Sequence, residues 1–277
     1  MKRKLRNGIS VVLAAAFVIS GALAVGQLYD YRAADKAYET AQELALPSAP
    51  EPAPVIEPEL PETPVPMAPE PVLEEPVQAP LEENAQFLLE LDLDALRQTN
   101  ERVLGWICIP NSPIDYPLVE VQDNNEYLRR AWDGTPNQAG CIFLECRNSR
   151  DFSDFNTMIY GHYMQNGKMF GSLHDYQEQE YRDTHPYIYI VTDQGVRRYE
   201  VFASYKAYVN SDTYRLSFEN DVRKQSVLDY CLGRSVLNTG LVPTAADHIL
   251  TLSTCTGTGN YNTRWVVQAV LTGEFSK

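Results

Sequence analysis

The sequence predicts a mainly β protein whose ordered part is an eight-stranded β-barrel with an N-terminal helix. A second helix is expected in the long connection between strands 6 and 7. Three observations support this fold. Eight short runs rich in β-branched and aromatic residues follow one another over residues 103–272, and few stretches between them have helical spacing. The composition of the preceding sequence also removes much of its length from any core.

The chain opens with a basic cluster and a long apolar stretch. Ile9–Leu28 holds roughly 20 mostly apolar residues, which at about 1.5 Å rise each would cross a hydrocarbon core of about 30 Å. Because four basic residues precede it, we expect residues 1–29 to be a cytoplasmic amino terminus and a single-pass membrane anchor, with everything after Tyr29 outside the cell. A cleaved signal peptide is the alternative, since Ala22-Leu23-Ala24 has the pattern of a cleavage site. The apolar stretch continues past that site, which favours the anchor.

Residues 30–84 are expected to form a short helix and a stalk. Asp30–Leu46 mixes Ala, Glu, Gln and Lys without Gly or Pro, which predicts a helix continuing from the membrane. Pro47–Pro80 holds 12 of the 18 prolines, with acids between them. Such a segment cannot bury a core and favours polyproline II geometry, with a reach of up to roughly 100 Å. We therefore expect a spacer between the membrane and the ordered part.

The distribution of charge argues against a nucleic-acid partner, and the cysteines bear on thiol and metal chemistry. The formal charge of −14 is uneven, since residues 1–36 sum to +4, residues 37–96 to −14 and residues 97–277 to −4. A nearly balanced ordered part gives no electrostatic basis for nucleic-acid binding. The cysteines form an odd set, so at least one thiol should be free. No cofactor or metal is expected, because neither the five cysteines nor the four histidines have convincing zinc spacing.

Residues 85–277 contain the ordered part, and its elements follow in order. Apolar residues at helical spacing predict a helix over Ala85–Thr99. The eight predicted strands are Val103–Ile109, Tyr116–Val121, Gly140–Leu144, Thr157–Tyr160, Tyr187–Thr192, Arg198–Val209, His248–Ser253 and Arg264–Thr272. Asn210–Asp247 is a long connection for a compact domain. Within it, Phe218–Gly233 is predicted to be an amphipathic helix with Val222 on its apolar face.

Three residues at strand ends indicate nucleophilic catalysis. Cys255 ends an apolar run and precedes a flexible polar turn, so a rigid strand would hold its thiol open to a substrate. His162 ends another such run. Arg264 follows Cys255 by nine residues, a spacing that allows a strand, a tight turn and a return to the same rim. Taken singly, each has a structural alternative: an inert buried cysteine, a structural histidine or a surface arginine.

The order of segments along roughly residues 90–277 resembles that of the class B sortases, cysteine transpeptidases of bacterial cell surfaces. The matching segments are Asn100–Pro110, Ile114–Pro117, Asp123–Asn124 with Tyr127–Leu128, Ile159–His162 with Met164, Met169–Phe170 and Thr251–Cys255. The resemblance implies a sortase-like barrel, a substrate groove with the helix of the long connection as one wall, and a catalytic domain over residues 85–277. Thr256 and Gly257 depart from the acidic residues that often follow the cysteine, which puts in doubt an acidic partner there.

The resemblance also implies a reaction. Cys255 would attack the carbonyl after a threonine in a sorting signal, His162 would protonate the leaving amine, and Arg264 with the backbone N–H beside Cys255 would stabilise the oxyanion. An amine would then resolve the thioester. Usual pKa values of about 8.5 for Cys and 6.5 for His leave about one site in a hundred as thiolate and imidazolium, and the sequence does not decide whether the pocket changes that balance. Further substrate contacts are expected from Ser253, Thr254, Asn124 and Tyr160.

The implied partners are surface proteins with a carboxy-terminal signal, Asn-Pro-x-Thr-like or a variant, and an amine acceptor in a peptidoglycan precursor or a pilin. A pilin-polymerising sortase with a lysine acceptor is an alternative, although the stalk lacks a D-P-W/F/Y triplet. An alternative from another class is a catalytically inactive binding module displayed at the surface.

Overall fold

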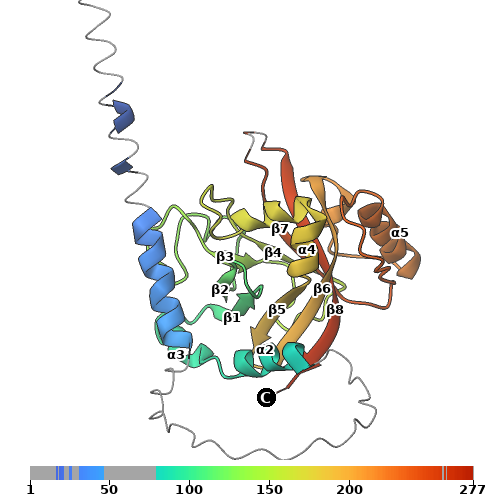
Figure 1. Ribbon diagram of the computed structural model, residues 1–277, viewed down its shortest axis with the longest axis horizontal. Coiled ribbons are helices and arrows are strands. Elements are labelled where there is room, and N and C mark those ends of the chain that lie inside the picture. The colour runs from blue at the N-terminus through green and yellow to red at the C-terminus, as the bar shows by residue number, and fades with distance from the viewer. Residues whose placement is uncertain are drawn as a thin grey trace, which may run out of the picture.

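Eight strands form the body of the protein. The computed structural model describes residues 17, 19–21, 25–26, 31–46, 79–257, 259 and 261–276. The strands are β1 (Val103–Cys108), β2 (Asp115–Val119), β3 (Ile142–Leu144), β4 (Asn156–Tyr160), β5 (Tyr187–Thr192), β6 (Gly195–Tyr208), β7 (Ile249–Cys255) and β8 (Thr263–Phe275). They close into a barrel in the order β1-β2-β3-β4-β7-β8-β6-β5, as Figure 1 shows from one side. The eight-stranded barrel predicted from the sequence is confirmed.

Two of the strand pairs are parallel, namely β2 with β3 and β4 with β7, and the other neighbours are antiparallel. Every strand overlaps a predicted one, and β5 has the predicted bounds. The strands β6 and β8 are longer than predicted because their antiparallel ladder runs the whole length of both strands, through two register shifts. This long pair places the start of β8 next to the end of β7.

Strand β7 is covered on both faces. Leu250 and Leu252 belong to the core inside the barrel, whereas Ile249 packs outside it with Val227 and Leu228. All positions of β7 are buried except the last, Cys255. This explains why the segment is a nearly continuous apolar run, since a strand covered on both faces has no solvent-facing side.

The predicted helix over Ala85–Thr99 is two helices in the structure. They are α2 (Ala79–Leu89) and α3 (Leu93–Arg97). The Asp92 side chain accepts the N–H of Ala95 at 2.9 Å and so caps the start of α3. The single-helix prediction was wrong because this cap begins a new helix within the predicted one.

The helix predicted in the long connection is α5 (Asp221–Leu232). It begins after Asn220, whose side chain accepts the N–H of Arg223 at 2.9 Å. Val227, Leu228 and Cys231 form its buried face. Val222 is 79% exposed, contrary to its predicted place on the apolar face. It lies five residues from Val227, which turns it about 140° around the helix axis.

Three short helical segments were not predicted. Of these, η1 (Gly171–Gln177) and α4 (Gln179–Thr184) connect β4 to β5, and η2 (Asp212–Tyr214) follows β6. Segments of one or two turns leave little periodicity in a sequence. Two of them nevertheless contribute side chains close to the open end of β7, as described below.

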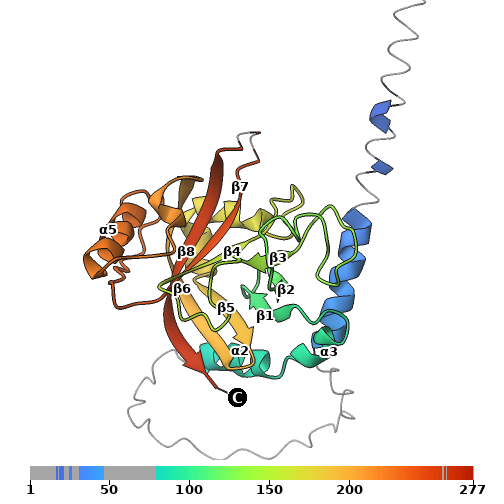
Figure 2. The same ribbon diagram turned by 180° about the vertical axis from the view of Figure 1, so that it is seen from behind.

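Residues 31–45 form a helix, as the sequence predicted for Asp30–Leu46, and this helix packs against the barrel. Both ribbon views show it along one side of the barrel (Figures 1 and 2). The Tyr38 hydroxyl donates to the carbonyl of Gly140 at 2.5 Å, and Lys168 pairs with Asp35 at 2.5 Å. The buried residues of this helix repeat along one of its faces. They are Ala34, Tyr38, Ala41 and Ala45.

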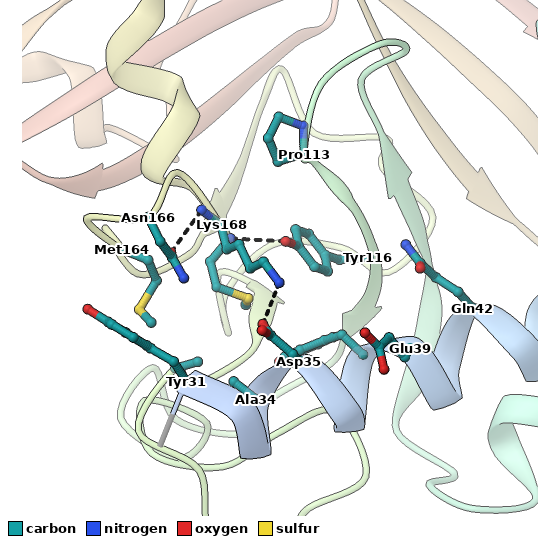
Figure 3. A pocket seen from close by; sticks show the side chains of 13 residues that line it. Tyr31, Ala34, Asp35, Glu39, Gln42, Pro113, Tyr116, Met164, Asn166 and Lys168 are labelled. Carbon is teal, nitrogen blue, oxygen red and sulfur yellow. Dashed lines mark hydrogen bonds and ion pairs between the residues drawn. The ribbon is translucent and has the colours of Figure 1, made fainter. Parts of the chain in front are cut away.

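A cavity of about 250 Å³ remains between this helix and the barrel. Figure 3 shows Asp35 reaching from the helix toward Lys168 across the cavity, with Tyr116 on the barrel side. Beyond the cavity, the N–H of Asp92 donates to the carbonyl of Ala45 at 3.0 Å. The carboxyl end of the helix is therefore attached to the turn between α2 and α3.

The expected membrane anchor needs a correction. Within the parts of the chain that the structure describes, no helix has both the length and the apolar character needed to cross a bilayer. The longest described helical stretch before residue 46 covers residues 31–45, about 22 Å at 1.5 Å per residue, and carries charged side chains. This finding contradicts the expected single-pass membrane location. Most of Ile9–Leu28, and residues 47–78 of the expected stalk, lie outside the described residues.

Candidate active site

Three neighbouring strands bring His162, Cys255 and Arg264 to one edge of the barrel. In the parallel pair of β4 and β7, Tyr160 is level with Ser253, and His162 and Cys255 each follow two residues later. The N–H of Gly161 continues this pairing by donating to the carbonyl of Ser253 at 3.3 Å. On the other side of β7, Cys255 is paired with Arg264 of β8. The thiol therefore lies between the imidazole and the guanidinium.

The three side chains line one pocket of about 220 Å³. The predicted substrate contacts Ser253, Asn124 and Tyr160 also line it. Ser253 and Cys255 share a face because side chains two residues apart on a strand point the same way. Thr254 lies between them and is 2% exposed, so its side chain faces away from the pocket. The structure thus brings together six of the seven residues selected from the sequence.

The position of His162 is fixed by two backbone contacts. Its Nε2 lies 2.7 Å from the carbonyl oxygen of Leu128. Because a carbonyl can only accept, Nε2 carries the proton, which leaves Nδ1 as the basic nitrogen. Gly140 lies against the same ring edge, since a Cβ at this position would be 2.5 Å from Cδ2 and 3.0 Å from Nε2 of His162. Burial lowers the pKa of His162, the bond to Leu128 opposes this in part, and nearby Arg129 lowers it further. The folded protein thus favours the neutral imidazole.

Arg264 is held by the turn between β7 and β8. Its Nη1 donates to the carbonyls of Tyr261 and Thr263, both at 2.9 Å. A guanidinium has five N–H donors and stays protonated, so it can hold the turn and also serve a ligand in the pocket. Its contribution to the site is a permanent positive charge on the strand next to Cys255.

A buried carboxylate beneath the pocket was missed by the sequence analysis. Glu145 follows β3 and is 1% exposed. It accepts hydrogen bonds from Asn124 Nδ2 at 2.8 Å, the Tyr160 hydroxyl at 2.9 Å and Arg147 Nε at 2.7 Å. Burial alone would raise the pKa of Glu145, but these bonds lower it overall. Asn124 and Tyr160 therefore form the pocket wall while their polar atoms bind Glu145.

Tyr214 was also missed. It belongs to η2 in the long connection, and its hydroxyl forms a hydrogen bond of 2.9 Å with the Ser253 hydroxyl. Burial raises the pKa of Tyr214 to about 12, although the bond with Ser253 lowers it. The long connection thus approaches the site through η2. Among the described residues, none of α5 lines this pocket, so the expected wall made by the helix is not part of it.

The remaining histidines and cysteines lie in different surroundings. His248 precedes β7 and its Nδ1 contacts the carbonyl of Asp154 at 3.0 Å, in keeping with its predicted place at a strand end. His174 contacts the carbonyl of Cys255. All five cysteines are free thiols, whereas their odd number had predicted only that at least one is free. Within the described ranges no group of three or more His, Cys, Asp or Glu side chains is arranged to hold a metal ion.

This fold and site define a class of protein. A closed mixed barrel carries an exposed thiol at the end of a buried strand, with an imidazole and a guanidinium on the two flanking strands. These groups can form an acyl-enzyme on sulfur, transfer a proton and stabilise an oxyanion. The arrangement is that of a cysteine acyl-transfer enzyme.

Comparison with known proteins places the chain in a family. The sortase domain family matches residues 107–272. Sortase B of Staphylococcus aureus is 31% identical over 174 residues, covering 63% of this chain and 71% of that protein. Sortase B of Listeria monocytogenes is 32% identical over 183 residues, covering 65% and 74% respectively. The solved Staphylococcus aureus sortase B-substrate complex has a TM-score of 0.63 and 29% identity, covering 72% of this chain and 95% of that one. The chain belongs to the sortase family of cysteine transpeptidases and is a class B sortase.

Proposed function

We propose that this sortase cleaves a sorting signal after threonine and transfers the protein to an amine of the cell wall, with Cys255 as nucleophile. The observation that carries the proposal is the position of Cys255, which lies between His162 and Arg264 at the edge of β4, β7 and β8 and lines one pocket with both. Each group has a separate task in an acyl transfer.

In the acylation step, Nδ1 of His162 takes the thiol proton and the sulfur attacks the carbonyl carbon after threonine. Arg264 stabilises the negative charge that develops on the carbonyl oxygen. Nδ1 then gives its proton to the leaving amine, the amide bond breaks, and a thioester remains on Cys255. In the second step an acceptor amine attacks the thioester and gives a proton to Nδ1 of His162, an amide bond forms, and the sulfur leaves as a thiolate that takes this proton back as the thiol.

The expected donor is a surface protein with a carboxy-terminal signal, Asn-Pro-x-Thr-like or a variant of it. The similarity to sortase B and the presence of a sortase B-substrate complex among the related structures support a peptide donor. One related structure is sortase B complexed with triglycine, which supports a glycine amine as the first acceptor to test. A lysine amine, as in a pilin, is the other acceptor to test.

The test is trapping of the acyl-enzyme. Wild-type protein incubated with a panel of signal peptides should gain the mass of the peptide segment that ends in threonine, and Cys255→Ala should not. The matched control is Cys146→Ala, which removes the other exposed thiol. Slight desolvation by its neighbours and the adjacent Glu145 carboxylate raise the pKa of Cys146, so this thiol stays protonated. Adding triglycine or a lysine peptide then identifies the acceptor by the product mass. A Cys255→Ala protein that turns over peptides like wild type would refute the proposal, and a wild type that forms no acyl-enzyme with any signal would favour a binding module.

A further inference from the structure

A second histidine touches the residue that carries the thiol. His174 belongs to η1, 81 residues before Cys255 in the sequence, and its Nε2 lies 3.0 Å from the carbonyl oxygen of Cys255. Since that oxygen can only accept, Nε2 carries the proton and donates it. The bond is made to the backbone of Cys255, so it leaves the thiol itself available.

The His174 ring is held between two aromatic rings of the site. Its centroid is 4.5 Å from that of Tyr163, which follows His162, and 5.7 Å from that of Trp265, which follows Arg264. Tyr163 also supports the chain beyond the thiol, because a Cβ added to Gly257 would lie 2.6 Å from its ring. His174 therefore contacts the backbone of Cys255 and the residues that directly follow His162 and Arg264.

The carbonyl of Cys255 is a point where added restraint matters. Cys255 is the last residue of β7, and the chain turns after it through Gly257, which has a positive φ of 69°. Because a peptide unit is planar, fixing this carbonyl fixes the whole unit that joins Cys255 to Thr256. Rotation about the Cα–C bond of Cys255 is then restricted, and so is the direction in which its side chain leaves the strand.

We propose that His174 is a positioning residue for Cys255, whose backbone carbonyl it holds through Nε2–H so that the thiol stays aligned with His162 and Arg264. This rests on the proposed function in taking Cys255 as the nucleophile. Loss of the bond misplaces the sulfur without removing any group that binds the peptide. It therefore lowers kcat and leaves KM nearly unchanged.

Three variants separate the hydrogen bond from ring packing. His174→Ala removes both, His174→Phe keeps an aromatic ring without a donor, and His174→Gln keeps an N–H donor at a similar reach without a ring. We expect kcat to fall about 10-fold in His174→Ala and His174→Phe, the scale of one lost hydrogen bond, and to stay within about 3-fold of wild type in His174→Gln.

His185 supplies the matched control. Its Nε2 also contacts a backbone carbonyl, that of Asn111 at 3.1 Å, and its ring stacks on Tyr181 with centroids 4.0 Å apart. His185→Ala thus removes the same kind of contact from a place outside the pocket, and its kcat should equal that of wild type. Thermal unfolding of all variants ensures that kinetics are compared between folded proteins.

A second measurement does not depend on turnover of a signal peptide. Because the thiol is misplaced relative to Nδ1 of His162, its alkylation by iodoacetamide at neutral pH should slow in His174→Ala and His174→Phe and recover in His174→Gln. If His174→Phe behaves like wild type in both assays and His174→Gln does not, ring packing and not the hydrogen bond positions the thiol. That result would overturn the inference. Wild-type kinetics in all three variants, with Cys255→Ala inactive, would also overturn it while leaving the proposed function intact. An active Cys255→Ala would instead refute the proposed function.

Discussion

Cys255 and Arg264 lie directly opposite each other across the antiparallel pair of β7 and β8. Residues paired in this way have Cβ atoms about 4.5–5.5 Å apart. The distance between the thiol-bearing and charge-bearing residues is thus set by strand register, which the long ladder of β8 with β6 keeps from slipping. The parallel pairing of β4 with β7 sets the position of His162 in the same way.

Replacing Arg264 should lower kcat even where the positive charge is kept. In Arg264→Ala we expect kcat to fall about 100- to 1000-fold, because a donor for the oxyanion is lost. Arg264→Lys keeps the charge but not the planar set of donors, so recovery should be partial. Steady-state kinetics with a signal peptide would measure both. Arg198→Ala is the control, since this arginine bonds Thr272 on β8 away from the pocket. Full activity in Arg264→Lys would show that charge alone suffices.

Glu145 should make stability fall in acid. Its pKa is lowered by the bonds from Arg147, Tyr160 and Asn124 after burial is overcome. The folded carboxylate thus binds a proton less readily than the unfolded one, whose pKa is about 4.3. The stabilisation is complete above that pH and is lost as the pH falls through the folded pKa. Urea unfolding against pH should show this loss in wild type.

In Glu145→Gln the same acid-dependent loss should be smaller, and at pH 7 the unfolding free energy should be lower by about 2 kcal/mol. Glu120→Gln is the control, because Glu120 pairs with Arg150 at the surface, where such pairs contribute about 0–1 kcal/mol. Equal effects of the two substitutions would contradict the role given to Glu145.

His162 should titrate below the usual histidine range. Burial lowers its pKa from 6.5, so the unfolded chain binds more protons just below that pH. Stability should therefore decline as the pH falls below about 6.5 and down through the folded pKa. NMR of histidine-labelled protein would follow the ring, with His162→Asn assigning its signals. A midpoint at or above the usual histidine value, or a proton on Nδ1 of the neutral ring, would refute the arrangement described here.

Gly140→Ala should damage the site through His162. The glycine has a positive φ of 63°, and an added Cβ would lie 2.5 Å from Cδ2 of the imidazole. The ring must move, so we expect kcat to fall at least about 10-fold. Gly134→Ala is the matched control, because Gly134 also has a positive φ, 81°, but open space around its Cβ position. Both substitutions should lower stability by about 1 kcal/mol through backbone strain. Gly140→Ala should lower it further, because its added Cβ would also lie 2.9 Å from the carbonyl oxygen of Leu128. Peptide kinetics and thermal unfolding separate the two effects, and equal kcat values would refute the contact with His162.

The barrel could be predicted because each strand has a local signal. The run Tyr187–Thr192 predicts β5 with its observed bounds. Cys255, His162 and Arg264 are indicated both by their places at the ends of such runs and by the resemblance of the surrounding segments to class B sortases. At Asp92 the apolar spacing alone was misleading, because the side chain of this residue caps a new helix within the predicted one.

The residues that support the site had no comparable signal. Glu145 binds Asn124 from 21 residues away, Tyr214 binds Ser253 from 39, and His174 contacts Cys255 from 81. Only the closure of the barrel brings these pairs together. Spacing along the chain predicts which residues share a strand face, but not which loop passes over the end of the strand.

The attachment of the 31–45 helix changes how the proline-rich sequence after it should be understood. Ala45 is bonded to Asp92, and α2 begins at Ala79 on the same body, so the chain leaves the barrel near residue 46 and returns by residue 79. The described residues on either side of the proline-rich sequence therefore lie on one body, as does the helix of residues 31–45. The distance from the pocket of Cys255 to anything joined to residue 31 is thus independent of the length of that sequence. That distance is set by the fifteen-residue helix 31–45, which packs along one side of the barrel.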